Sequence, residues 1–301
     1  MGKLADDLNK IKSSLKMREV EEVYDIYFSR FLGYYLARVA ARMKLTPTNV
    51  TVLSMVSGMI GGGLYFWTGH LWVAVIASLM ITLAGLLDSA DGQLARMTGQ
   101  STAFGRVLDG VADTFVFIAC YVGACAYYVF GPGDFIWIIP IAMVAGYMHN
   151  FKNCVYDLYK SEMLFYGGGF AYMQTKTREE LKEELSKYHG LEKLLYWFYT
   201  DYLRRQLLGS SRKKTMNRLK ACYEANRESF PQVYIRHQQK LLRGWAWVGG
   251  LNVHRWGIIL SCLLVRFDIY LYVVIATFPS LFLMNYLQYK ADLRVLTHFK
   301  S

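Results

Sequence analysis

The sequence predicts an all-α, polytopic membrane protein with about six transmembrane helices. Of its 301 residues, 54% are hydrophobic and 16% are aromatic. The apolar residues gather in runs of about twenty, which is the length that crosses a bilayer core roughly 30 Å thick. Basic residues collect in alternate segments between these runs, as on the cytosolic side of membrane proteins.

Residues 1–47 are expected to be a cytosolic or interfacial amphipathic helix. From Tyr24 to Met43, one helical face carries Tyr27, Phe28, Phe31, Leu32, Tyr35, Leu36 and Val39. This pattern is typical of a helix that lies in the membrane interface before the first span. The turn from Leu45 to Asn49 contains capping residues and a proline, so a new helix is expected to start there. In that helix, Gly58 and Gly62 permit close packing against a neighbour.

Six apolar runs are expected to span the membrane, at about 49 to 68, 70 to 96, 102 to 130, 134 to 157, 246 to 266 and 269 to 289. The connections after the first, third and fifth spans are short and nearly free of Lys and Arg, so they are expected to face away from the cytosol. The basic segments lie on the other side: the amino-terminal helix, Arg96 to Arg106, Lys152 to Arg243, and the tail with Lys290, Arg294 and Lys300. Both termini are therefore expected in the cytosol.

These spans divide the chain into parts. Residues 48–160 hold spans one to four, and residues 246–301 hold spans five and six and a cytosolic tail. Residues 161–245 are predicted to form a cytosolic helical insertion, because a stretch of this length rarely stays without structure in a compact protein. Its segment from Leu191 to Leu208 is rich in Leu and aromatic residues, and Lys176 to Lys187 interleaves Glu and Lys at helical spacing.

The insertion also contains a basic turn from Ser210 to Lys214, which we expect to face anionic lipid head groups. We interpret the insertion as an amphipathic surface subdomain, with substrate recognition or a partner site as alternatives. The formal net charge of +11 does not imply a nucleic-acid partner, because the basic residues lie between apolar blocks and form no separate basic domain.

Four carboxylates lie at the facing ends of spans two and three. A charged side chain inside a span costs about 2.5 to 3.5 kcal/mol on insertion scales, so these residues indicate a function. Asp88 and Asp91 are three residues apart and Asp109 and Asp113 are four apart, so each pair projects from one helical face. The short loop from Met97 to Ser101 puts both pairs at a similar depth, where they can meet.

Converging carboxylates repel one another unless cations neutralise them. Ligands that are all oxygen, without His or Cys, suit hard ions such as Mg²⁺ or Mn²⁺, and Mg²⁺ commonly binds carboxylates together with substrate phosphates. Gly92 allows close backbone approach, Ala95 leaves room one turn on, and Arg96 is a forked cation suited to phosphate. For Arg96, anchoring at the membrane surface is the alternative explanation.

The complete string from Asp88 to Asp113 matches the pattern D-x2-D-G-x2-A-R-x8-G-x3-D-x3-D at all eight fixed positions. This pattern is the signature of the CDP-alcohol phosphotransferase family, which the chain resembles. The stretch from Thr46 to Thr51 is similar to the family's T-P-N-x-x-T opening of the first span, with Thr48 where Asn is usual. The similarity covers about residues 24 to 160, and the long insertion departs from the family.

The resemblance implies a membrane enzyme of phospholipid synthesis with its catalytic core in residues 48–160 and its active site facing the cytosol. A two-metal centre of Mg²⁺ or Mn²⁺ would be held by Asp88, Asp91, Asp109 and Asp113. Asp109 and Asp113 would be catalytic, with Asp113 as the general base. The CDP group would lie among Asp88, Gly92, Ala95, Arg96 and Gly105. The resemblance also suggests a homodimer, which the glycine-bearing spans allow without requiring it.

Polar residues near the ends of spans four and five are candidates for binding the acceptor alcohol: His149, Asn150, Lys152, His254 and Arg255. A cation there would suit a phosphorylated or anionic acceptor, whereas a neutral lipid acceptor would need an apolar groove. Interhelical hydrogen bonds are the alternative explanation for the two histidines, and snorkelling is the alternative for Lys152.

The main hypothesis is metal-dependent transfer of a phosphatidyl group from a CDP-linked donor, such as CDP-diacylglycerol, to an alcohol hydroxyl with release of CMP. A variant within the family transfers a phospho-head-group from CDP-choline or CDP-ethanolamine to a lipid hydroxyl. A membrane prenyltransferase with Asp-rich motifs is a different class, but a second, distant Asp-rich motif is absent from the sequence. A transporter or an inactive scaffold is the third class, and a transporter would not need the Gly and Ala-Arg positions.

Overall fold

The computed structural model describes residues 17, 19–22, 24–101, 103–131, 134–169, 183, 187, 189–210 and 212–299. Within these ranges all regular structure is helical, as predicted. They form two compact units, and the first contains residues 24–146 and 255–273, apart from the gaps just given. The second contains residues 17–22, 147–254 and 274–299. The predictions for residues 1–16, for most of the segment from 176 to 187 and for Lys300 lie outside the described residues.

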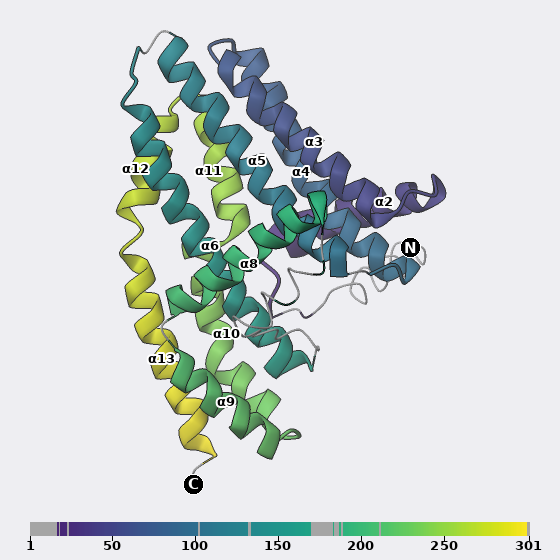
Figure 1. Cartoon of the computed structure of the whole chain (residues 1–301), viewed down its shortest axis with the longest axis vertical. Helices are drawn as coiled ribbons and strands as arrows, with labels where there is room; N and C mark the ends of the chain where they lie inside the picture. Colours follow the sequence, from purple (N-terminus) through teal and green to yellow (C-terminus); the bar gives the residue numbers. More distant parts are fainter. Residues whose placement is uncertain are drawn as a thin grey trace. The chain divides into compact units, whose positions relative to one another are not determined.

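The first unit is built around α3 (Pro47–Leu64), η2 (Tyr65–Trp67), α4 (Leu71–Thr98) and α5 (Ala103–Phe130), drawn in Figure 1. The predicted start of α3 is confirmed, because the Thr46 side chain accepts a hydrogen bond from the Asn49 backbone N–H at 3.2 Å and Pro47 occupies the first turn. α4 ends at Gly99, whose φ of 68° favours glycine. The short connection that follows leads directly into α5.

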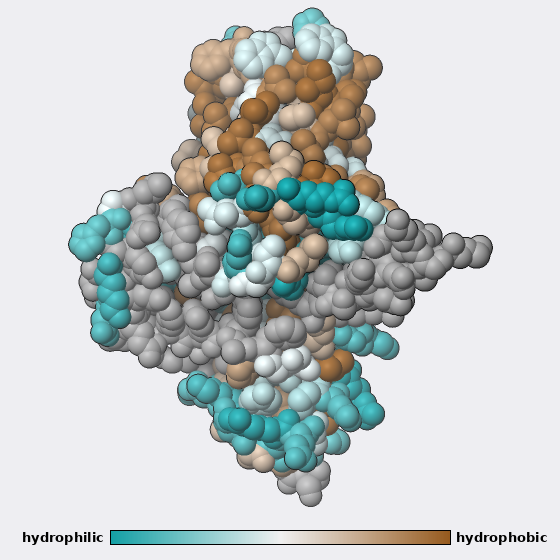
Figure 2. All heavy atoms as spheres, turned by 90° about the vertical axis from the view of Figure 1, so that its right-hand side faces the viewer, coloured by the Kyte–Doolittle hydropathy of each residue, from teal (hydrophilic) through white to brown (hydrophobic). Residues whose placement is uncertain are grey.

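Three helical segments of this unit are long and apolar enough to cross a membrane, which makes the chain a multi-pass membrane protein. They are Pro47–Trp67, Leu71–Thr98 and Leu108–Phe130, and they confirm the first three predicted spans. Figure 2 shows the side of this unit formed by α3 and α4 as a mainly hydrophobic surface. Its exposed apolar residues include Leu53, Ile60, Trp72, Ile76 and Leu79.

The later predicted spans are reproduced less completely. α12 (Phe267–Ala276) and α13 (Ser280–His298) are bent by 41° and together qualify as one further span. α6 (Ile138–Gly168) does not qualify, because polar residues such as Lys152 interrupt its apolar run. α11 (Leu251–Leu264) has 14 residues and is about 21 Å long, too short for a bilayer core. The described residues therefore contain three or four candidate spans, and a total of six stays a prediction.

Small residues let α3 pack closely against both of its neighbours. A Cβ added at Gly58 would lie 2.5 Å from Val116 Cγ2 of α5, and one at Gly62 would lie 2.5 Å from the Cys120 backbone N. On the side facing α4, the Ser54 hydroxyl donates a hydrogen bond of 2.8 Å to a backbone carbonyl. The predicted packing role of the two glycines is confirmed.

The helix before the first span consists of η1 (Asp25–Ser29) and α2 (Arg30–Arg42), and α2 packs on α4. At the contact, the Gln93 side chain donates a hydrogen bond of 3.1 Å to the Arg30 carbonyl. A Cβ added at Gly33 would lie 3.0 Å from Ser89 Oγ, so this small residue brings the helices together. Several residues of the predicted apolar face remain exposed: Tyr27, Phe28 and Val39.

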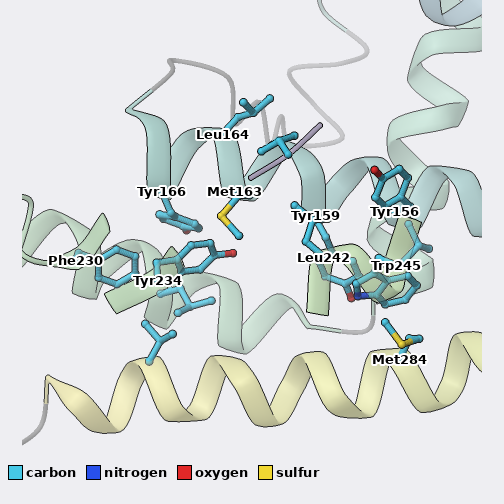
Figure 3. Close-up of a cluster of buried hydrophobic side chains, with 14 of the residues drawn as sticks. Tyr156, Tyr159, Met163, Leu164, Tyr166, Phe230, Tyr234, Leu242, Trp245 and Met284 are labelled. Atoms are coloured by element: carbon cyan, nitrogen blue, oxygen red, sulfur yellow. The ribbon is translucent and has the colours of Figure 1, made fainter. Parts of the chain in front are cut away.

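The second unit contains the later part of α6, α8 (Gly190–Ser210), α9 (Lys213–Ala225), α10 (Phe230–Gly249) and all of α13. The described residues of the insertion are therefore largely helical, as predicted. Figure 3 shows the aromatic core that joins α6, α10 and α13, in which Tyr166, Phe230, Tyr234 and Trp245 are fully buried. This core gives the second unit an apolar centre of its own.

A buried charge network joins the helices of the second unit. The Arg212 guanidinium, only 4% exposed, forms ion pairs with Glu162 of α6 at 3.2 Å and with Asp292 of α13. Gln238 of α10 donates a hydrogen bond of 2.8 Å to Asp292. Burial alone would lower the pKa of Arg212, but the two carboxylates raise that pKa well above its usual value. The expectation that the basic turn faces lipid head groups is thus wrong for Arg212.

Candidate metal centre

The first unit brings three of the four predicted carboxylates together. Asp88 and Asp91 project from the last turns of α4, and Asp109 projects from α5. Each offers a carboxylate oxygen, and these oxygens all lie within 4.8 Å of one another. The spacing within each helix and the short α4–α5 connection produce this convergence, as the sequence predicted.

Asp91 is fixed by a third helix. Its side chain is 5% exposed, and its Oδ2 accepts a hydrogen bond from the Thr51 hydroxyl of α3. Thr51 lies one turn after Pro47, whose carbonyl also accepts from the Thr51 hydroxyl at 3.1 Å. Thr51, near the start of α3, therefore orients one of the three converging carboxylates. Residues that support a metal ligand act in this way.

Asp113 lies outside the group of three and faces an arginine from the far end of the sequence. Arg255 Nη2 lies 3.5 Å from Asp113 Oδ1 and 3.9 Å from Asp88 Oδ2. Gly85 of α4 leaves space for this guanidinium, because a Cβ added there would lie 2.5 Å from Arg255 Nη1. Arg255, predicted as an acceptor residue, is thus part of the acidic site.

The charges of this site fit divalent cations. The four aspartates carry a formal charge of −4 when ionised, and Arg255 contributes +1. The three converging groups offer only carboxylate oxygens. Such a donor set suits a hard ion such as Mg²⁺ or Mn²⁺ rather than zinc. The residues therefore fit a divalent metal ion.

The residues predicted to surround a nucleotide lie on the same two helices. Gly92, Ala95 and Arg96 occupy the last turns of α4, and Gly105 lies in the first turn of α5. A Cβ added at Gly92 would lie 3.5 Å from Arg96 Nη1, so the Arg96 guanidinium folds back beside the glycine. Gly92, Ala95 and Gly105 are half-buried, and Arg96 is exposed.

The other predicted acceptor residues belong to the second unit. The rings of His149 and His254 stack with their centroids 3.8 Å apart. Lys152 is 2% exposed, and its ammonium donates a hydrogen bond of 3.0 Å to Thr277 Oγ1. Asn150 accepts a hydrogen bond from Arg205 of α8. The five predicted residues are therefore divided, with Arg255 in the first unit and the remaining four in the second.

Sequence reasoning did not assign Thr51 or Gly85 to the site. Thr51 belongs to the capped start of α3, so its motif was visible, but its partner Asp91 is 40 residues away. Gly85 lies one turn before Asp88, and its role depends on Arg255 from another helix. The sequence signal that could have assigned Gly85 to the site is its position one turn before Asp88, the first aspartate of the signature.

Comparisons with known proteins match the same region. Residues 44–152 match the family model described as CDP-alcohol phosphatidyltransferase. A phosphatidylinositol phosphate synthase of Mycolicibacterium smegmatis is 34% identical over 96 residues, which are 32% of this chain and 42% of that protein. A bifunctional IPC transferase and DIPP synthase of Aquifex aeolicus is 28% identical over 151 residues, 49% of this chain and 34% of that protein.

A third similar protein is a CDP-diacylglycerol–serine O-phosphatidyltransferase of Mycobacterium leprae, 33% identical over 81 residues, which are 27% of this chain and 26% of that protein. The matched stretches thus span less than half the length of each of these relatives.

Proposed function

Because the chain belongs, through residues 44–152, to the CDP-alcohol phosphatidyltransferase family, we propose that it transfers a phosphatidyl group from CDP-diacylglycerol to an alcohol, releasing CMP. The convergence of Asp88, Asp91 and Asp109 carries this proposal. Two similar relatives, named a phosphatidylinositol phosphate synthase and a serine O-phosphatidyltransferase, support phosphatidyl transfer over head-group transfer.

In this proposal the aspartates of α4 and α5 bind two Mg²⁺ or Mn²⁺ ions. When bound, the ions neutralise the diphosphate and the charge that develops on the leaving CMP. Asp88, Asp91 and Asp109 hold them, and Thr51 keeps Asp91 in position. Asp113 has the same kind of carboxylate and shares the site, so we include it as the fourth ligand.

Asp113 is also the proposed general base. It takes the proton of the acceptor hydroxyl as the hydroxyl oxygen forms a bond to the lipid-linked phosphorus. The bond from this phosphorus to the bridging oxygen breaks, and CMP leaves with the electron pair. Arg255, 3.5 Å from Asp113 Oδ1, orients this carboxylate and balances part of the site's charge. Gly92, Ala95, Arg96 and Gly105 bind the CDP group.

The acceptor is proposed to be a phosphorylated or otherwise anionic alcohol. Lys152 supports this, because a buried ammonium with a threonine hydroxyl beside it favours a negatively charged ligand. His149, Asn150, His254 and Arg255 are the other proposed acceptor residues. A neutral lipid acceptor would instead favour an apolar groove.

The topology proposed with this function has six spans, with both termini and the active site facing the cytosol. Residues 48–160 form the catalytic core, and residues 161–245 form the cytosolic insertion. The basic connections described above support this orientation. A homodimer is part of this proposal, although Gly58 and Gly62 of α3 pack on α5 of the same chain.

Release of CMP by the purified protein tests the function. The protein in lipid nanodiscs with Mg²⁺ or Mn²⁺ is given CDP-diacylglycerol, CDP-choline or CDP-ethanolamine, each with polyol, polyol phosphate, serine and diacylglycerol acceptors. We expect CMP with CDP-diacylglycerol and an anionic acceptor, and none from Asp109→Asn. CMP only from CDP-choline or CDP-ethanolamine with diacylglycerol would support head-group transfer, and no CMP from any donor would contradict the proposal.

A further inference from the structure

α8, in the insertion that departs from the family, exposes apolar side chains. The exposed fractions are 50% for Leu194, 53% for Trp197 and 74% for Leu208. These residues share one face of the helix. They are spaced by three and eleven residues, which are close to one and three whole turns. A helix on the water-facing surface of a protein would direct such residues inward.

The opposite side of α8 carries polar side chains that bond to α6. The Tyr202 hydroxyl donates a hydrogen bond of 2.8 Å to Asp157 Oδ2, and the Gln206 amide donates one of 3.4 Å to the same oxygen. Arg205, eleven residues after Leu194 and so at the flank of the exposed face, donates a hydrogen bond to Asn150, about two turns before Asp157. α8 is therefore held by hydrogen bonds on its inner side, the arrangement expected where the outer side meets lipid.

α8 contacts α6 directly after an apolar stretch of α6. Before Asn150, α6 exposes a run of apolar side chains: Ile139, Met143, Val144 and Tyr147. The α8 contacts begin directly after this run, between Asn150 and Asp157. Figure 1 shows α8 crossing α6 obliquely rather than extending it. Amphipathic helices lie along bilayer surfaces, where tryptophan is enriched.

Exposed basic residues lie on α8 and in the first turn of α9. Lys193, Arg204 and Lys214 are exposed. Asp201 is paired with Arg205 at 2.9 Å, so its charge is balanced within the helix. This surface complements anionic lipid head groups.

We propose that α8 lies on the cytosolic surface of an anionic bilayer, with Leu194, Trp197 and Leu208 inserted among the lipids. The helix then anchors the insertion to the membrane. This inference is independent of the reaction assigned to the metal centre, because it uses only residues of α6, α8 and α9.

Depth measurements on the full chain test this proposal. The five native cysteines are replaced by alanine, and a spin label is placed at Trp197→Cys or at Leu194→Cys, in vesicles of phosphatidylcholine and phosphatidylglycerol. Glu224→Cys, on an exposed position of α9, is the matched control. We expect the ratio of collision with oxygen to collision with a water-soluble nickel chelate to be several-fold higher at positions 194 and 197 than at 224.

Two outcomes would overturn the proposal. Equal ratios at the three positions would mean that α8 faces water, and protection from both reagents would mean that protein, such as a second copy of the chain, covers it. If the cysteine-free chain fails to fold, Trp197→Phe in the natural background gives the same information. Brominated lipids should then quench less fluorescence in this variant than in the unaltered protein, and unchanged quenching would contradict lipid contact.

Discussion

At the scale of single residues, Arg255 and Thr51 determine how the acidic site is organised. Arg255 reaches Asp88 and Asp113, and Thr51 reaches Asp91. The spacing of the signature predicted which aspartates converge, because that spacing is local to two helices. It could not predict these partners, since Arg255 is 142 residues after Asp113 and no local pattern links the two.

Replacing Thr51 with valine should weaken metal binding and turnover. The change keeps the shape of the side chain and removes the hydroxyl that donates to Asp91. Loss of such a supporting hydrogen bond costs about 10–100-fold in metal affinity or activity. CMP release measured against Mn²⁺ concentration would show this, and Thr51→Ser should retain most activity. Equal metal dependence in the valine variant and the unaltered protein would exclude the role.

Replacing Gly85 with alanine should act through Arg255. The added Cβ would lie 2.5 Å from Arg255 Nη1 and would displace the flexible guanidinium. Loss of a charged hydrogen-bonding partner is worth roughly 1.5–3 kcal/mol, so turnover should fall about tenfold or more. The double variant Gly85→Ala, Arg255→Ala should lose no more turnover than the less active of the two single variants. Both changes remove the same interaction, so their effects should not add. If the fold-losses of turnover in the two single variants instead multiply in the double variant, Gly85 does not act through Arg255.

At the scale of helices, local sequence signals predicted where helices start and which surfaces pack. They predicted the lengths of the helices less well. Two predictions of this kind are the cap at the start of α3, formed by Thr46 and Pro47, and the packing surface at Gly58 and Gly62. In both, the residues determine a property of the helix to which they belong. The end of α10 was missed, because the apolar run from 246 to 266 continues past it. The break comes at Gly250, whose backbone is extended with ψ of 138°, and a hydropathy pattern does not register this conformation.

Replacing Gly62 with leucine should destabilise the first unit. A Cβ at this position would lie 2.5 Å from the Cys120 backbone N, which cannot move aside like a side chain. Overpacking of this kind costs about 1–3 kcal/mol or more. Thermal unfolding in detergent would measure the loss. Gly63→Leu is the matched control, because nothing lies within 4 Å of a Cβ added there, and equal stability of the two variants would argue against close α3–α5 packing.

At the scale of the whole molecule, the chain combines a unit that carries the family signature with a second unit that has its own core. Composition and apolar runs predicted an all-helical membrane protein, since these properties are summed over many residues. They could not predict that Arg212 of the basic turn is buried between Glu162 and Asp292, because both partners come from distant helices.

Replacing Arg212 with methionine should destabilise the second unit. The change leaves the carboxylates of Glu162 and Asp292 buried without their cation, and breaking a buried ion pair costs roughly 3–5 kcal/mol. Chemical unfolding, followed by tryptophan fluorescence, would report the loss because Trp245 lies in this core. Lys214→Met, at an exposed position of α9, should have little effect. A stability of Arg212→Met equal to that control would contradict the structural role of the network.

Manganese binding tests the central claim, that the carboxylates of α4 and α5 form a divalent metal centre. Electron paramagnetic resonance of Mn²⁺ titrated into the purified protein in nanodiscs distinguishes bound from free ion. We predict saturable binding that Mg²⁺ competes away, that Asp91→Asn and Asp109→Asn together abolish, and that Asp134→Asn, at an exposed position, leaves intact. Equal binding in all variants, or no saturable binding by the unaltered protein, would contradict the account.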